Sequence, residues 1–191
     1  MRVALATGNA GKVAEIRRLL PMLELVERPD IPEPVEDGDT LLDNARIKAR
    51  AVCAATGLAA VADDTGLFVD ALDGEPGVLT ARYAGEDCTY EDNWRKLLRE
   101  LGDRADRGAT WRTIALVAFP DDTELWAEGT CTGAIVREAR GTDGFGYDPV
   151  FVPDGASVTY AEMSSDEKNA ISHRGAAFRA LAHKISSHPD S

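Results

Sequence analysis

The sequence predicts an α/β protein, in which helices pack against a β-sheet. Three observations indicate this class. Residues 58–66 (LAAVADDTG) form a short apolar run closed by polar residues, which is typical of a buried strand that ends in functional groups. Residues 2–20 read as a strand, a glycine turn and a helix. Residues 111–119 and 124–136 are rich in β-branched and aromatic side chains, and the turn at residues 120–122 joins them as a hairpin-like pair.

The first third of the chain continues this pattern. Residues 2–7 predict the first strand. A helix follows over residues 12–20, where apolar side chains recur at helical spacing until Pro21 ends it. Residues 23–26 predict a second strand. The segment from residue 27 to residue 43 holds seven acidic residues, so we expect an acidic loop that is either simply solvated or holds a cation.

The middle of the chain alternates between the two kinds of element. A helix is expected over residues 41–55, because small and apolar side chains repeat along one face. Residues 67–72 alternate in polarity and are expected to pair with the strand at residues 58–66, before a turn at Asp73-Gly74. A long irregular loop should then lead to a helix over residues 90–101.

The last third carries a glycine loop and two helices. Residues 141–149 (GTDGFGYDP) predict a shaped loop, and Pro149 favours an extended Asp148 before a strand at residues 150–152. A polar helix is expected over residues 160–171. A last helix should end near residue 185, and the tail from about residue 186 is expected to be disordered.

Length and composition exclude several classes. At 191 residues the chain is expected to form a single domain over residues 1–191 with its own core. The net charge of -12 argues against non-specific nucleic-acid binding, which needs many basic contacts to phosphates. Neither a membrane span nor a signal peptide is recognisable. The three cysteines are odd in number and far apart, which argues against a disulfide framework or a zinc site and favours a reducing cytoplasm.

Two acids, Asp63 and Asp64, follow the apolar run of the central strand. Ligands of α/β proteins gather at the ends of strands, and Mg²⁺ takes carboxylate oxygens while keeping waters for substrate phosphates. The pair therefore suits a divalent cation. A solvated turn explains the same residues, because Asp, Thr and Gly are common in turns.

The glycine turn at residues 8–11 (GNAG) is a second candidate. Between a strand and a helix it would point backbone N–H groups and the positive end of the helix dipole at an anion, and Lys12 would add a full charge. A tight turn without a ligand explains the segment equally well. It is not a P-loop, because Ala6 and Val13 stand where that motif needs Gly and Ser or Thr.

Two further segments carry binding chemistry. The loop at residues 141–149 places Phe145 and Tyr147 among glycines, where they would either stack on a flat base or plug the end of the sheet. Residues 172–174 (SHR) concentrate hydrogen-bond donors at a helix junction.

Several of these pieces stand in a specific order: residues 7–12 (TGNAGK), Glu36, residues 62–66 (ADDTG), residues 144–149 (GFGYDP), and Lys168 with residues 172–174 (SHR). Together they closely resemble the inosine/xanthosine triphosphate pyrophosphatase family, whose members hydrolyse non-standard purine nucleoside triphosphates. The resemblance runs from about residue 1 to residue 185, and residues 81–85 (ARYAG) also look like this family. No piece is specific alone, but the ordered set is.

The resemblance implies a two-lobed α/β fold around a long central mixed sheet flanked by helices, usually a homodimer, that needs Mg²⁺. It implies hydrolysis of ITP, dITP or XTP to the monophosphate and pyrophosphate. Asp64 resembles the residue that activates water and, with Glu36, a metal ligand. The substrate-binding positions implied are Thr7, Gly8, Asn9, Ala10, Gly11 and Lys12 as a triphosphate loop, Lys48 near phosphate, Thr65, and a base-binding set of Phe145, Gly146, Tyr147, Asp148, Lys168, His173 and Arg174.

Base choice would then depend on donors. Hypoxanthine and xanthine carry an oxygen at C6 where adenine carries an amino group, so Lys168, His173 and Arg174 would favour the oxo-purines. An unpaired donor costs about 1–3 kcal/mol.

Two alternatives to the pyrophosphatase function remain. An aspartyl-phosphate phosphatase spaces its acids by one residue, whereas Asp63 and Asp64 are adjacent. A non-catalytic nucleotide-binding module with a regulatory role is the other.

Overall fold

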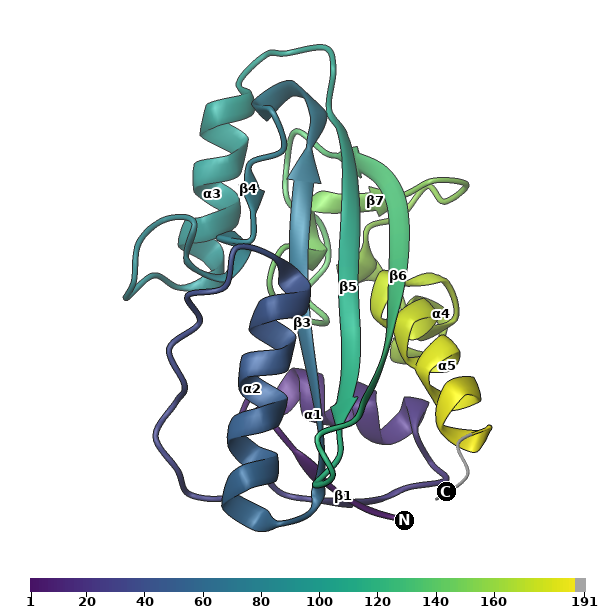
Figure 1. The fold of residues 1–191 in the computed structure, drawn as a ribbon. Coiled ribbons are helices and arrows are strands. Elements are labelled where there is room, and N and C mark those ends of the chain that lie inside the picture. The colour runs from purple at the N-terminus through teal and green to yellow at the C-terminus, as the bar shows by residue number, and fades with distance from the viewer. Residues whose placement is uncertain (188–191) are drawn as a thin grey trace. The chain divides into compact units, whose positions relative to one another are not determined.

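The computed structural model describes residues 1–187 and shows a mixed α/β fold (Figure 1). Most of the tail expected to be disordered therefore lies outside the described residues. The strands are β1 (Arg2–Leu5), β2 (Glu24–Val26), β3 (Ala59–Val69), β4 (Pro76–Gly77), β5 (Gly108–Ala118), β6 (Glu124–Ile135) and β7 (Phe151–Pro153), and the α-helices are α1 (Ala10–Leu19), α2 (Leu41–Thr56), α3 (Tyr90–Leu101), α4 (Ser165–Ile171) and α5 (His173–Ser186).

The described strands form a mixed sheet in the order β2-β1-β3-β5-β6-β7, and β4 pairs with β3. Strand β1 pairs in parallel with both β2 and β3, and Leu5 lies opposite Val61. Strand β4 runs antiparallel to β3, as β7 does to β6. The expected mixed α/β fold is confirmed.

The described chain divides into two compact units, each assembled from separate segments. Residues 1–64, 113–129 and 173–187 form the first unit, and residues 65–112 and 130–172 form the second. Strands β3, β5 and β6 therefore contribute residues to both units. The predicted site residues are likewise divided between the two.

The core of the first unit follows from the alternation of side chains along its strands. Val3, Val61 and Val117 point to the face on which α1 and α5 pack, and they contact Ile16 and Phe178 of those helices in one buried cluster. The side chains that alternate with them point to the other face, and α2 lies along β3 (Figure 1). The buried strand residues of this unit are thus divided between two faces of the sheet.

The second unit has its own core. Leu97 and Leu101 of α3 join Trp111 of β5 and Phe151 of β7 in a buried cluster. A capping box at Thr89 starts α3, as the polar residues before this helix allow.

Within residues 1–187, no helix has the length and hydropathy to cross a membrane. All three cysteines are free thiols, as expected.

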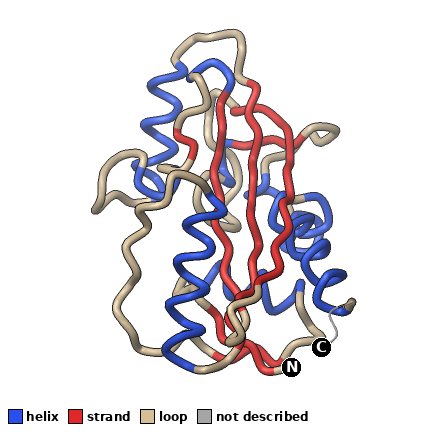
Figure 2. Tube along the Cα trace, in the orientation of Figure 1, coloured by secondary structure: helices blue, strands red, loops and turns tan. Residues whose placement is uncertain are grey.

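The main difference from the sequence prediction concerns the central strand. We expected it to end at the acidic pair and residues 67–72 to form a partner, but β3 runs without a break from Ala59 to Val69 (Figure 2). Hydrogen-bonded pairing continues on both sides of the pair, with β1 before it and with β4 after it. Gly66 is not a turn residue. A Cβ there would lie 2.8 Å from the carbonyl oxygen of Gly77, so glycine permits the close approach of β4.

Four smaller predictions were also wrong. Helix α1 begins at Ala10, two residues early, because Asn9 caps it. The irregular loop after residue 75 contains β4. Asp148 lies in a 3₁₀ turn (Asp148–Val150), since a proline is tolerated in the first turn of a helix. The helix expected over residues 160–171 is interrupted, because Ser164 caps a separate α4.

Gly129 of β6 allows a test of how closely α5 packs against this strand. A Cβ at this position would lie 2.1 Å from the carbonyl oxygen of His173 and 2.3 Å from the amide nitrogen of Ala177. Both are backbone atoms, which cannot rotate away. We therefore expect Gly129→Ala to lower the free energy of unfolding by about 1–3 kcal/mol. Urea denaturation measures this, and Gly8→Ala, where a Cβ meets nothing within 4 Å, is the control.

Candidate functional site

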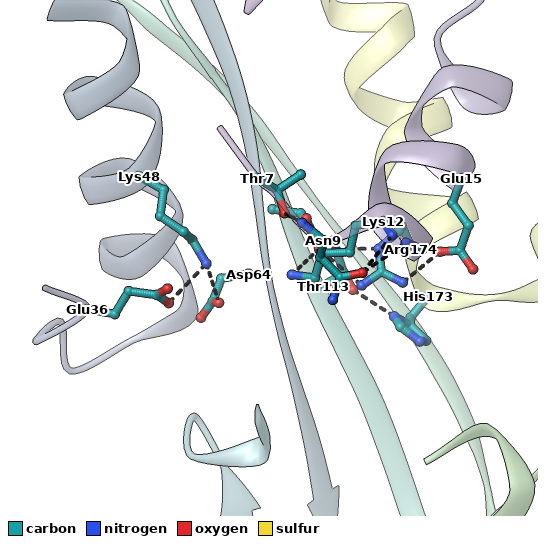
Figure 3. A network of polar contacts seen from close by, with 12 residues as sticks. Thr7, Asn9, Lys12, Glu15, Glu36, Lys48, Asp64, Thr113, His173 and Arg174 are labelled. Carbon is teal, nitrogen blue, oxygen red and sulfur yellow. Dashed lines mark hydrogen bonds and ion pairs between the residues drawn. The ribbon is translucent and has the colours of Figure 1, made fainter. Parts of the chain in front are cut away.

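The two adjacent carboxylates of β3 point to opposite faces of the sheet. Asp63 follows Val61 toward α1 and α5. Asp64 points toward Lys48 of α2 (Figure 3). Since Leu5, the last residue of β1, pairs with Val61, both acids lie beyond the end of β1 and beside the loop that follows it. They therefore belong to two different groups of charges in the first unit.

On the α2 side, Lys48 binds two carboxylates at once. Its Nζ lies 2.7 Å from Oδ1 of Asp64 and 3.0 Å from Oε2 of Glu36. Burial lowers the pKa of Lys48, but the charges of Asp64 and Glu36 outweigh it, and the pKa is raised. Burial raises the pKa of Asp64 above its usual value, Lys48 and Lys12 oppose this, and the charge of Glu36 adds to it. Asp64 therefore accepts a proton more readily than an exposed aspartate.

The loop before α2 is fixed so that Glu36 reaches this group. The backbone N–H of Gly38 donates to Oδ1 of Asn44 at 2.9 Å. A Cβ at Gly38 would lie 2.6 Å from the Cβ of Asp43, so the loop can pass this close to α2 only at a glycine. Thr40 starts the helix by accepting a hydrogen bond from the N–H of Asp43.

Glu36 and Asp64 fit a small divalent cation. Their oxygens already converge on one positive charge, the ammonium group of Lys48. Mg²⁺ is commonly bound by one or two carboxylates and completes its coordination with waters and substrate phosphates. In residues 1–187 no group of three or more His, Cys, Asp or Glu residues is placed to hold a metal. Glu36 and Asp64 would leave the other coordination positions of a bound Mg²⁺ to waters and phosphates.

The loop after β1 is organised by Asn9. Its side-chain oxygen accepts hydrogen bonds from the N–H groups of Gly11 and Lys12, at 3.0 and 3.2 Å. Oγ1 of Thr7 accepts from the N–H of Asn9 at 3.2 Å. The positive end of the α1 dipole is thus directed into the loop. A phosphate that bound these N–H groups would replace the Asn9 oxygen.

On the opposite face of β3, Asp63 binds two cations. Its Oδ2 accepts from Nε and Nη2 of Arg174 at 3.2 and 3.1 Å, and it lies 3.1 Å from Nζ of Lys12. Nη1 of Arg174 donates to Oε2 of Glu15 at 2.8 Å. The Arg174 guanidinium, which the resemblance assigns to the base, is thus anchored by two carboxylates within its own unit. Figure 3 shows Glu15, one of the two, beside it.

These buried charges shift one another's pKa values. Burial alone would raise the pKa of Asp63, but Lys12 and Arg174 hold it far below its usual range. Burial alone would lower the pKa of Arg174, but its carboxylate partners raise it. The pKa of Lys12 is lowered, first by burial and then by Lys48 and Arg174, whereas Asp63 and Asp64 oppose this. Lys12 therefore responds to the charges on both faces of β3.

In the second unit, Lys168 and Asp148 form a buried pair. Nζ of Lys168 lies 2.6 Å from Oδ2 of Asp148 and 4.8 Å from the centre of the Phe145 ring. The same Asp148 oxygen accepts from the N–H of Phe145 at 2.8 Å. Gly144 permits this turn: its φ is +77°, and a Cβ would lie 2.0 Å from Oδ2 of Asp148. The loop thus holds an aromatic ring and a cation together, an arrangement suited to a flat ligand.

The side chain of Tyr147 is buried. Its hydroxyl donates to the carbonyl oxygen of Thr80 at 2.9 Å, and its ring packs edge-on against Trp111, with 5.9 Å between ring centres. Tyr147 therefore follows the second of the two alternatives for this loop, because it is a hydrophobic plug and is not placed to stack on a base. Phe145 is half-buried and stays the candidate for stacking.

The described structure places the predicted site residues in two sets. In the first unit lie Thr7, Gly8, Asn9, Ala10, Gly11, Lys12, Glu36, Lys48, Asp64, His173 and Arg174. In the second lie Thr65, Phe145, Gly146, Tyr147, Asp148 and Lys168.

Sequence reasoning missed four residues that organise the first set. They are Asp63, which we read only as part of an acidic pair, and Glu15, Asn44 and Thr113. The polar Asn44 sits on the buried face of α2, and Thr113 inside the apolar strand β5. A buried polar residue needs a partner, and this was the available signal.

Comparison with known proteins finds relatives over nearly the whole chain. The family model described as the Ham1 family matches residues 3–184. A dITP/XTP pyrophosphatase of Elusimicrobium minutum is 47% identical, over 97% of this chain and 100% of its own length. One of Synechococcus sp. is 50% identical, over 94% of this chain and 87% of its own.

Among solved structures, the Staphylococcus aureus Ham1 protein is similar at 35% identity and a TM-score of 0.87, covering 98% of this chain and 99% of that one. The resemblance noted in the sequence is thereby confirmed over nearly the whole chain. The chain belongs to the Ham1 family.

Proposed function

We propose that this protein hydrolyses the non-standard purine nucleoside triphosphates ITP, dITP and XTP to the monophosphate and pyrophosphate, and so cleanses the nucleotide pool. Membership of the Ham1 family and relatives named dITP/XTP pyrophosphatase support this activity. The observation that carries the proposal is the group of Glu36, Lys48 and Asp64 in the same unit as the Asn9-capped loop and Lys12. Carboxylates, ammonium groups and a helix N-terminus are what phosphoryl transfer requires.

The proposed reaction gives each of these residues a role. A water oxygen attacks the α-phosphorus, the bond to the bridging oxygen breaks, pyrophosphate leaves, and the proton of the water passes to Asp64. The raised pKa of Asp64 suits a proton acceptor. Lys12 and Lys48 neutralise phosphate oxygens. Mg²⁺, when held by Glu36 and Asp64, supplies further positive charge there.

Base selection is proposed to depend on hydrogen-bond donors, among which His173 and Arg174 belong to the first unit. His173→Ala should lower the ratio of kcat/KM for ITP to that for ATP by roughly 5- to 150-fold, because the donor that meets the 6-oxo group is lost. Steady-state assays with both nucleotides measure this. An unchanged ratio would remove His173 from base recognition.

One assay tests the proposed function. Purified protein incubated with ITP and Mg²⁺ should yield IMP and pyrophosphate, and chelation of the metal should stop the reaction until Mg²⁺ is added back. Release of orthophosphate with IDP contradicts the proposal. Tight binding of ITP without any product would instead establish the non-catalytic regulatory module.

A homodimer in the cytoplasm is also proposed, on the strength of the family resemblance. The three free thiols support a reducing compartment. Light scattering after size-exclusion chromatography should give twice the mass of the 191-residue chain. A monomeric mass over the working range of concentration would contradict the dimer.

A further inference from the structure

Thr113 makes a polar contact inside the core of the first unit. It lies on β5, is 0% exposed, and its Oγ1 lies 2.7 Å from Nδ1 of His173 (Figure 3). Thr113 shares the alternating register of Ala115 and Val117, so it points to the face of the sheet on which α5 packs. The hydroxyl therefore meets the imidazole at the start of α5.

The neighbouring strand fixes the backbone of the same histidine. A Cβ at Gly129 of β6 would lie 2.1 Å from the carbonyl oxygen of His173, so backbone meets backbone at this point. The His173 side chain is itself buried, with the whole residue 4% exposed. The ring is thus held by β5 and its backbone by β6, and the orientation of the imidazole is set by the sheet.

The surroundings favour a neutral imidazole. His173 is the first residue of α5, and the positive end of a helix dipole disfavours a further positive charge. The next residue, Arg174, is a buried cation whose carboxylate partners Asp63 and Glu15 are already engaged with it. A neutral imidazole carries one N–H, and the hydrogen bond made by one ring nitrogen sets the state of the other.

We propose that the Thr113 hydroxyl donates its hydrogen bond to Nδ1 of His173 and so holds the tautomer with the proton on Nε2. Nε2–H is then a donor for the 6-oxo group of hypoxanthine or xanthine. The opposite tautomer would present a bare Nε2, which accepts a hydrogen bond and matches the 6-amino group of adenine. Thr113 is therefore a positioning residue that determines purine specificity. This inference rests on the proposed function for its choice of base.

A pair of substitutions isolates the hydroxyl. Thr113→Val keeps the shape of the side chain and its place in the core but removes the donor, whereas Thr113→Ser keeps the donor. We expect Thr113→Val to lower the ITP-to-ATP ratio of kcat/KM by roughly tenfold and Thr113→Ser to retain most of it. Thermal unfolding verifies that both variants are folded. An unchanged ratio in folded Thr113→Val overturns the specificity role.

The tautomer can be measured without catalysis. In ¹⁵N-labelled wild-type protein, two-bond ¹H–¹⁵N correlations of the histidine rings distinguish a protonated from a bare nitrogen. Comparison with His173→Gln identifies the His173 signals. A bare Nδ1 and a protonated Nε2 are expected in the wild type. A proton on Nδ1, or protons on both nitrogens at neutral pH, overturns the proposal.

The two readouts separate the inference from the function on which it rests. If the wild type releases no pyrophosphate from ITP, the proposed function fails, and the specificity role of Thr113 fails with it. The spectra still report on the Thr113 to His173 bond in that case. If the wild type is active on ITP and its Nδ1 carries the proton, the proposed function stands and the inference alone is wrong.

Discussion

Asp64→Asn should lower kcat for ITP by about 10²- to 10⁴-fold while the protein stays folded. The amide keeps the size of the carboxylate but can neither take a proton from water nor supply an anionic oxygen to a cation. The amide oxygen can still accept a hydrogen bond from Lys48, and Lys48 keeps Glu36 as a charged partner, so the variant is expected to stay folded. Pyrophosphate release under saturating ITP and Mg²⁺ measures the effect, with circular dichroism as the check on folding.

A matched control lies close by. Asp43 is an acidic residue of α2 and pairs with Arg46 at 3.1 Å on the surface. Asp43→Asn removes one charge from the same helix without touching Asp64 or Glu36, so its kcat should stay close to that of the wild type. A near-normal rate for Asp64→Asn would exclude Asp64 from the mechanism.

Asp63→Asn, in contrast to Asp64→Asn, should act on stability and destabilise the fold by about 3–5 kcal/mol. The Asp63 carboxylate is the shared partner of Lys12 and Arg174, so its loss removes a negative charge from beside two buried positive ones. Chemical denaturation measures the loss. Glu24→Gln, which breaks an exposed pair with Arg2, should cost about 1 kcal/mol or less. Equal losses in the two variants would show that the Asp63 pairs do not stabilise the fold.

The same carboxylate predicts a dependence of stability on pH. The pKa of Asp63 is lowered in the folded state, so the folded protein binds this proton less readily than the unfolded chain does. The stabilisation by its ion pairs is therefore complete above the ordinary pKa of an aspartate, about 3.9, and is lost as the pH falls below it. The difference in unfolding free energy between wild type and Asp63→Asn should shrink as the pH is lowered from about 5 to about 2. A constant difference would contradict this assignment.

Asp63 and Asp64 are adjacent in sequence but have different roles, because neighbouring residues of one continuous strand point to opposite faces of the sheet. Alternation along β3 sends Asp64 to Lys48 on α2 and Asp63 to the side of α1 and α5. An aspartyl-phosphate phosphatase would need both acids in one group, so this arrangement speaks against that alternative. It also explains why a pair of acids that resembles a turn contributes both to stability and to the proposed chemistry.

The sequence alone determined the kinds of element and the residues that bear the family resemblance. Apolar spacing located the helices α2 and α3, and β-branched composition located β5 and β6, because these signals depend on residues within a few positions of each other. The family resemblance brought forward Glu36, Lys48 and Asp64, and the structure places Nζ of Lys48 in contact with both carboxylates.

Only the tertiary structure decided the partners of the buried polar groups. Asp63 and Arg174 are 111 residues apart in sequence, and Thr113 and His173 are 60 apart. Likewise β3 continues past Gly66 because β4, ten residues away, supplies its hydrogen bonds. Such contacts have no local periodicity. They exist because a buried charge or hydroxyl must find its partner among whatever segments folding brings alongside, and that choice depends on the packing of the whole unit.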